Sequence, residues 1–144
     1  MGSVRFKRLN DLVPIPCYAK PGDVGLDLTA VAIEKKYERC VLFNTGIAVQ
    51  PPEGYHFKLY NRSSTHKLGY CLANNVGVID EGYTGFIMAP LMKLDDTALH
   101  EDEVIGKRIV QLVLEKSYTQ FHIHEVEMFN QTSRGDSGFG SSGK

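Results

Sequence analysis

The chain has 144 residues and a formal net charge of -1, from 16 basic and 17 acidic residues. This length suits one domain with its own hydrophobic core, and the near balance of charge argues against a long nucleic-acid polymer as the main ligand. The three cysteines form no C-x-x-C pair, and neither a membrane-spanning apolar run nor a signal peptide is evident. We therefore expect an intracellular soluble protein of the cytoplasm or nucleus, and a viral origin stays open.

Short strand-like runs rich in Val, Ile, Leu, Phe and Tyr follow one another along the chain, and helical periodicity is nearly absent. In chain order, we expect strands over residues 4–9, 40–49, 56–60, 86–91 and 109–114. Turns rich in Pro, Gly and Asp separate several of these runs, as is typical of antiparallel strands. The pattern predicts an all-β protein, either a barrel or a jelly roll.

Three segments depart from the strand pattern. One short helix is predicted over residues 65–68, capped by the hydroxyls of residues 63–65 and ended by Gly69. The polar, acidic segment 93–103 is predicted to be an exposed loop. Beyond about Met128 the strand pattern stops, and a polar linker leads to a glycine-rich tail. We therefore divide the chain into a core, residues 1–128, and a flexible C-terminal arm, residues 129–144.

The tail, residues 134–143, contains four glycines, Arg134, Phe139 and several hydroxyls, and it cannot pack a core of its own. Glycines let backbone N–H groups turn toward an anion. An arginine offers a planar fork for phosphate oxygens, and a phenyl ring offers a face on which a base can stack. The composition predicts a lid for a nucleotide, with a flexible, solvated terminus as the alternative.

Four further segments place polar residues in or beside apolar runs, where burial without partners costs on the order of a kcal/mol or more each. They are residues 25–28, 62–64, 74–85 and 106–112. These segments supply an acid, a basic fork with hydroxyls, an amide with an acid and a phenol, and an amide donor. Together with the tail they suit a triphosphate, a metal ion, an activated water and a base.

The five segments, in this order and at these spacings, resemble the five motifs of the trimeric dUTP pyrophosphatases, over the whole chain. The most specific parts are the Arg-Gly-x-x-Gly-Phe-Gly-Ser tail and the run Asn74-Asn75-Val76-Gly77-Val78-Ile79-Asp80-Glu81-Gly82-Tyr83-Thr84-Gly85. The resemblance implies a jelly roll that assembles into a homotrimer, with each active site built from three subunits and closed by a C-terminal arm. It also implies Mg2+-dependent hydrolysis of dUTP to dUMP and pyrophosphate.

The same resemblance assigns roles within the third motif. Asp80 matches the carboxylate that positions and activates the attacking water. Tyr83 matches the ring that packs on the deoxyribose and leaves no room for a 2′-hydroxyl. Asn74 matches the amide that pairs with the uracil edge, together with hairpin backbone groups that we place at Gly77 and Val78.

The remaining motifs supply the phosphate and metal groups. Arg62, Ser63 and Gln111 match phosphate-contacting residues, and Ser64 lies in the same loop and is a further donor. Asp27 matches the acid that interacts with Mg2+ through water.

The arm and the departures from the family pattern complete the comparison. Arg134 would meet the γ-phosphate and Phe139 would stack on uracil, with Gly140 and Ser141 in the same substrate-binding arm. Residues that differ from common family choices, and that indicate a divergent branch, are Asn61, Ser64, Gly82, Thr84, Lys107 and Val110.

Other interpretations stay open. Taken singly, Asp80 could open a turn and Asp27 could be an outward polar residue of a strand. A dCTP deaminase-like enzyme is a second candidate, although the place of its glutamate is held here by Pro90. A nucleotide-binding regulatory module that acts through a protein partner is a third. Residues 122–125, with two histidines at period 2, could clip a metal, but the pattern favours a solvated strand face.

Overall fold

The computed structural model describes residues 2–138 and 140, and most of the regular structure in that part is strand. The strands are β1 (Arg5–Arg8), β2 (Gly25–Thr29), β3 (Ala32–Lys36), β4 (Cys40–Asn44), β5 (Ile47–Gln50), β6 (Tyr55–Asn61), β7 (Tyr70–Leu72), β8 (Gly77–Ile79), β9 (Met88–Lys93) and β10 (Arg108–Lys116). A 3-10 turn, η1 (Thr65–Leu68), lies where the short helix was predicted, and it ends at Gly69 in the left-handed conformation. The all-β prediction is confirmed.

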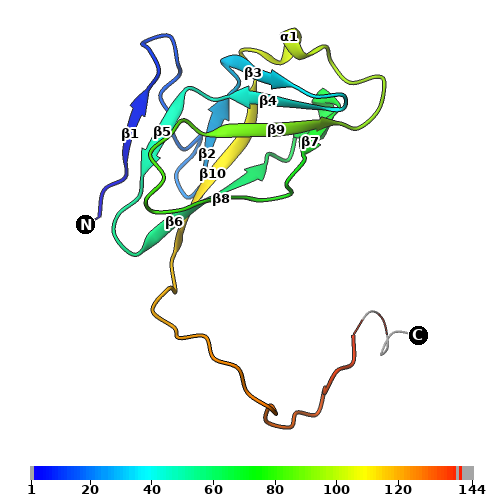
Figure 1. Cartoon of the computed structure of the whole chain (residues 1–144). Coiled ribbons are helices and arrows are strands. Elements are labelled where there is room, and N and C mark those ends of the chain that lie inside the picture. Colours follow the sequence, from blue (N-terminus) through cyan, green and yellow to red (C-terminus); the bar gives the residue numbers. More distant parts are fainter. Residues whose placement is uncertain (1, 139, 141–144) are drawn as a thin grey trace.

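The strands form three antiparallel groups: a β1-β5 ribbon, a sheet of order β2-β10-β6-β8, and a sheet of order β3-β4-β9-β7. In Figure 1, β3, β4 and β9 run across the view, whereas β1, β5 and β10 rise steeply. Alternate residues of β6 turn inward, and Phe57 and Leu59 are buried there. The rings of Phe43 and Tyr70 meet edge to face in this core, with centroids 6.3 Å apart.

The single strand predicted over residues 40–49 is wrong, because the chain breaks there into β4 and β5. Gly46 has φ of 65°, and a Cβ at this position would lie 2.8 Å from Val13 and 2.9 Å from Val31. The side chain of Asn44 accepts the N–H of Gly46 at 2.7 Å and closes the turn. The chain thereby passes from one sheet to another, since β4 pairs with β9 and β5 with β1.

The loop predicted over residues 93–103 is also wrong at its end, where one turn of helix, α1 (Glu101–Val104), forms. The side chain of His100 caps the start of this turn, and the carboxylate of Glu103 accepts the backbone N–H of His100. Glu101 is only 8% exposed, and its carboxylate pairs with Lys36 at 2.8 Å and with Lys93 at 3.1 Å. The Lys36 hydrogen bond and the backbone N–H of Glu101, followed by Lys93, lower the pKa of this carboxyl to about 2.

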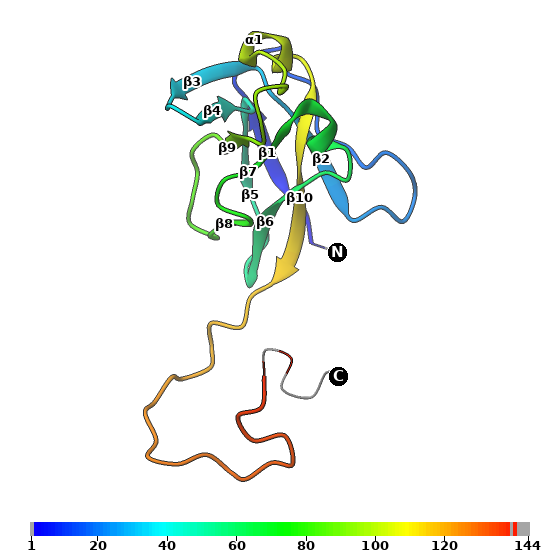
Figure 2. The same cartoon turned by 90° about the vertical axis from the view of Figure 1, so that its right-hand side faces the viewer.

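The chain leaves the folded body after β10. From Ser117 to Gly138, the structure shows neither helix nor strand, and the orange part of the trace runs away from the sheets in both views (Figures 1 and 2). The strand face considered for residues 122–125 is therefore absent, although these residues are exposed. Several apolar side chains of the segment are also exposed: Phe121, Ile123, Val126, Met128 and Phe129. Within residues 2–138, no helix has the length and apolar character needed to cross a membrane.

Candidate active site

A pocket of about 340 Å³ brings together four of the predicted site residues: Asp27, Arg62, Ser63 and Gln111. The rest of its lining comes from Ala19, Asp23, Val24 and Gly25. The pocket lies where β2, β10 and the loop after β6 meet, so the first, second and fourth motifs converge within one protomer.

Strand pairing explains how Asp27 and Gln111 come together. The two residues lie directly opposite each other in the β2–β10 ladder, and opposite residues of an antiparallel pair share a face. The amide nitrogen of Gln111 donates to the backbone carbonyl of Asn61 at 2.9 Å. A Cβ at Gly25 would collide with the amide oxygen of Gln111, so glycine at this position leaves the space that the side chain occupies.

Hydrogen bonds to both its backbone and its side chain hold Arg62 in place. The hydroxyl of Thr65 accepts the Arg62 N–H at 2.8 Å and donates to the carbonyl of Ile109 at 2.9 Å, which ties the loop to β10. The guanidinium Nε donates to Oδ1 of Asp27 at 2.7 Å, and Nη1 donates to the hydroxyl of Ser64 at 3.1 Å. Ser64 therefore supports Arg62 here and is not part of the pocket lining.

Two charged residues near this pocket, Asp23 and Arg108, have no role predicted from the sequence. Asp23 lines it, and its side chain accepts the N–H of Lys20 at 2.9 Å. Arg108 donates from Nη1 to Oδ2 of Asp27 at 3.2 Å. The sequence contained signals for both, since Arg108 stands inside the fourth motif and Asp23 ends the turn that precedes the first.

The third motif forms an exposed hairpin. Asn75 has φ of 59° in the turn before β8, and the N–H of Tyr83 donates to the carbonyl of Asp80 at 3.0 Å in the turn after it. The Tyr83 hydroxyl donates to the carbonyl of Phe86 at 2.9 Å, which fixes the ring. Even so, Tyr83 is 43% exposed and Val78 is 60% exposed. Asn74 and Asp80 are exposed as well, whereas Gly77 is buried against Leu59.

Within one protomer the Asp80 end of this hairpin lies away from the pocket. β8 and β2 are the two edges of one four-stranded sheet. Ile79, next to Asp80, pairs with Phe57 near the start of β6, whereas Arg62 follows the last residue of that strand. At about 3.4 Å per residue the five steps from Phe57 to Arg62 span about 17 Å. Asn74, Gly77, Val78, Asp80 and Tyr83 accordingly do not line the pocket.

The arm residues make local contacts where the structure describes them. Arg134 donates from Nε to the carbonyl of Ser137 at 3.2 Å, and Gly140 is exposed with φ of 81°. Phe139 and Ser141, which were predicted to contact substrate, lie outside the described residues.

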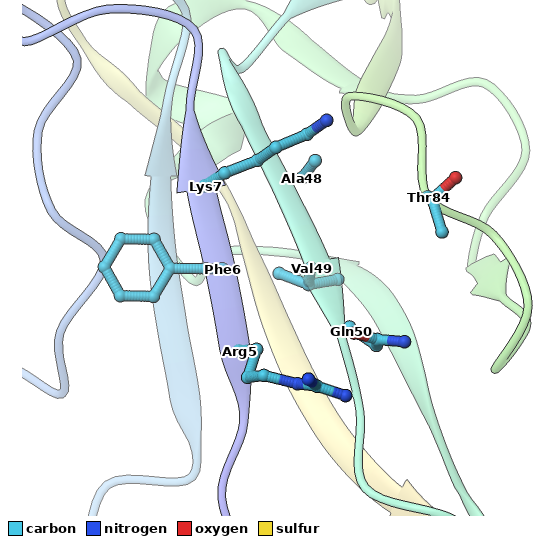
Figure 3. A pocket seen from close by; sticks show the side chains of 7 residues that line it. All are labelled: Arg5, Phe6, Lys7, Ala48, Val49, Gln50 and Thr84. Carbon is cyan, nitrogen blue, oxygen red and sulfur yellow. The ribbon is translucent and has the colours of Figure 1, made fainter.

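A separate cavity of about 250 Å³ lies over the β1-β5 ribbon (Figure 3). Arg5 and Lys7 point toward β5 there, whereas Phe6 points to the opposite side (Figure 3). The lining includes none of the predicted site residues, so the pocket beside Arg62 remains the candidate site.

Comparison with known proteins identifies the family. The dUTPase family model matches residues 11–143. A deoxyuridine 5'-triphosphate nucleotidohydrolase of Finegoldia magna is 39% identical over 137 residues, which cover 90% of this chain and 92% of that protein. The Rhodococcus erythropolis enzyme of the same name is 38% identical over 146 residues, or 98% of this chain and 86% of the relative.

Solved structures agree with this assignment. The dUTPase of Staphylococcus bacteriophage 80alpha with dUPNHPP superposes with a TM-score of 0.77 and 26% identity, covering 99% of both chains. The dUTPase of Streptococcus mutans has a TM-score of 0.68 at 26% identity, covering 81% of this chain and 98% of that one. The five motifs, the all-β fold and these relatives lead to one conclusion: the chain belongs to the dUTPase family.

Proposed function

We propose that this protein hydrolyses dUTP to dUMP and pyrophosphate with Mg2+, in sites shared between the copies of a homotrimer. The dUTPase relatives support the reaction. The observation that carries the proposal is the pocket in which Asp27, Arg62, Ser63 and Gln111 converge, because it gathers the groups that a triphosphate needs. The chain is accordingly a hydrolase of nucleotide metabolism.

The pocket suits a chain of phosphates. Arg62 contributes a delocalised cation that offsets the charge growing on the reacting phosphoryl group. Ser63 and the amide of Gln111 contribute neutral donors that orient the phosphates, while Ser64 keeps the guanidinium in place. Positioning and electrostatic stabilisation are the main requirements of phosphoryl chemistry, and these residues provide both.

Asp80 is the proposed general base. Its exposed carboxylate accepts a proton from a water molecule whose oxygen attacks the α-phosphorus. The bond from this phosphorus to the oxygen that bridges to the β-phosphorus breaks, and pyrophosphate leaves. Tyr83 packs on the deoxyribose, and Asn74, with backbone groups at Gly77 and Val78, pairs with the uracil edge.

The donor set also fits magnesium. Asp23 and Asp27 place two carboxylates in the lining of the phosphate pocket, and Mg2+ prefers oxygen ligands shared between carboxylates and phosphates. Both oxygens of Asp27 already accept from arginines, so Asp27 would hold the ion through water. Bound there, the ion would neutralise phosphate charge. No group of three or more His, Cys, Asp or Glu side chains suited to a metal occurs in the described part of the chain, and the substrate phosphates would supply further oxygen ligands.

A shared site follows from the separation of Asp80 and the pocket. The hairpin of one copy can complete the pocket of another, and three such head-to-tail contacts close a ring. The exposed apolar side chains of residues 121–129 give the departing segment a surface to bury against a neighbour. We propose that the core, residues 1–128, carries the pocket and hairpin. In this proposal the arm, residues 129–144, closes the site of a neighbouring subunit with Arg134, Phe139, Gly140 and Ser141.

The direct test is pyrophosphate release from a panel of deoxynucleoside triphosphates, with and without Mg2+, by wild type and Asp80→Asn. We expect turnover of dUTP by the wild type and a loss of about 100-fold to 10,000-fold in kcat for the variant, the usual range for a general base. Glu81→Gln changes a carboxylate in the same turn and serves as the control. Comparable turnover by Asp80→Asn would remove Asp80 from its assigned role.

The alternatives gain no support from these findings. Pro90, at the place of the deaminase glutamate, lies in β9 and offers no proton-transfer group. The release of ammonia from dCTP would nevertheless restore the deaminase hypothesis. A binding module that acts through a protein partner has no specific observation in its favour.

A further inference from the structure

The side chain of Arg62 uses two of its three guanidinium nitrogens for intramolecular bonds. Nε donates to Asp27 at 2.7 Å, and Nη1 donates to Ser64 at 3.1 Å and to the backbone carbonyl of Arg108 at 3.4 Å. None of the hydrogen bonds among the described residues uses Nη2. Because the side chain is 22% exposed and lines the pocket, Nη2 is the nitrogen left for a ligand.

The orientation of the Arg62 guanidinium, the fork that would bind phosphate, depends on Asp27. Both carboxylate oxygens of Asp27 in turn accept hydrogen bonds. Oδ1 receives Arg62, and Oδ2 receives Nη1 of Arg108 at 3.2 Å. The carboxylate is only 18% exposed. Rotation of an aspartate about its terminal torsion is soft, so one contact leaves the carboxylate plane loosely defined whereas two contacts define it.

Arg108 reaches Asp27 because of a β-bulge. The ladder with β2 shifts register between Arg108, which pairs with Thr29, and Val110, which pairs with Leu28. Ile109 and Val110 are consecutive and both fully buried, so the strict alternation of β10 is broken there. The extra residue puts Arg108 on the same face as Gln111, three positions later. In a regular strand, Arg108 would share the core side with Val110.

We infer that Arg108, aimed by this bulge, is a positioning residue of the active site: it fixes Asp27 so that Asp27 aims the Arg62 fork at the phosphates. Arg108 is 58% exposed and is not part of the pocket lining, so it acts through Asp27. The inference rests on the proposed phosphate role of Arg62.

The test compares Arg108→Gln with Lys107→Gln, an exposed neighbour of the same charge. We expect kcat/KM for dUTP to fall between about 10-fold and 100-fold in Arg108→Gln, as misplacement of a binding group does. Arg108→Lys should recover part of the loss because it keeps a cation near Oδ2. Lys107→Gln should match the wild type, and all variants should be assayed well below their melting temperatures.

A double-mutant cycle separates positioning from a general structural effect. In an Arg62→Gln background there is no fork left to aim, so adding Arg108→Gln should change kcat/KM less than about twofold. An unchanged kcat/KM in the single variant, or an equal loss in both backgrounds, would overturn the inference. A wild type that releases no pyrophosphate from dUTP would instead overturn the proposed function, and the two failures are therefore distinguishable.

Discussion

The side chain of Gln111 occupies space that is free because Gly25 has no side chain. Alanine at Gly25 would place a methyl group where the amide oxygen of Gln111 lies. Because that amide is the far end of a flexible side chain, the protein can fold by moving it, at the expense of its bond to Asn61.

We therefore expect Gly25→Ala to lower kcat/KM by roughly 10-fold or more, with a change in unfolding free energy below about 1 kcal/mol. Steady-state kinetics and thermal melting on the same preparation check both values. Gly2→Ala, where a Cβ meets only ordinary contacts with Pro52, is the control. A large loss of stability in Gly25→Ala would indicate that Gln111 does not move as described.

Residue roles were predictable from the sequence to different degrees. Asp27, Arg62, Ser63 and Gln111 were named from their motifs, and the pocket contains all of them. The role of Arg108 was not predicted, because a bulge decides which face of β10 it occupies and strand periodicity carries no sign of that extra residue. The predicted substrate contact of Ser64 stays a prediction, and its hydrogen bond from Arg62 was not foreseen.

At the scale of elements, ion pairs of one carboxylate, that of Glu101, link α1 to the ends of two strands. Lys36 ends β3 and Lys93 ends β9, and both reach Glu101. The folded-state pKa of Glu101, about 2, lies below its ordinary value of 4.5. The ion pairs therefore contribute stability above pH 4.5, and this contribution is lost as the pH falls toward 2.

Glu101→Gln should lower the unfolding free energy at pH 7 by about 1–3 kcal/mol, between the values for exposed and buried pairs, since Lys36 is half exposed. The difference in unfolding free energy between variant and wild type should narrow as the pH is lowered below 4.5. Urea unfolding at fixed protein concentration over that pH range measures this difference. Asp96→Asn, an exposed carboxylate of the same segment, should follow the wild type, and a gap that stays constant with pH would contradict the assignment.

Elements with strong patterns were predictable, and those decided by tertiary contacts were not. The strand runs at 4–9, 56–60 and 109–114 correspond to β1, β6 and β10, and the 65–68 helix is present. The break at Gly46 was missed because the crowding that requires glycine there comes from Val13 and Val31, which are distant in sequence. Helix α1 was missed because histidine is an uncommon cap.

At the scale of the whole molecule, the distance between Asp80 and the pocket predicts complementation between inactive variants. Asp80→Asn removes the general base that the hairpin contributes to a site. Arg62→Gln removes the phosphate-binding cation that the pocket contributes. If hairpin and pocket come from different copies, refolding the two variants together in equal amounts restores intact sites. Random mixing across head-to-tail contacts should return about one quarter of wild-type activity.

Pyrophosphate release after co-refolding, set against each variant refolded alone, measures this recovery. A mixture no more active than the separate variants would show that each site is completed within one chain. Assembly is the level at which the sequence was least informative, because surface complementarity between copies leaves no periodic pattern. The trimer was therefore predicted from the family resemblance alone.

β10 lies between β2 and β6, carries Arg108 and Gln111 at one end and leads into the arm at the other. A one-residue deletion in the regular part of this strand, after the bulge, would turn every later side chain to the opposite face, taking apolar residues to the solvent and polar ones to the core. It would also draw the tail back by about 3.4 Å. Insertions and deletions that change how far the arm extends are therefore tolerated only beyond Lys116. In related sequences, length variation should be confined to the loops and to that C-terminal stretch.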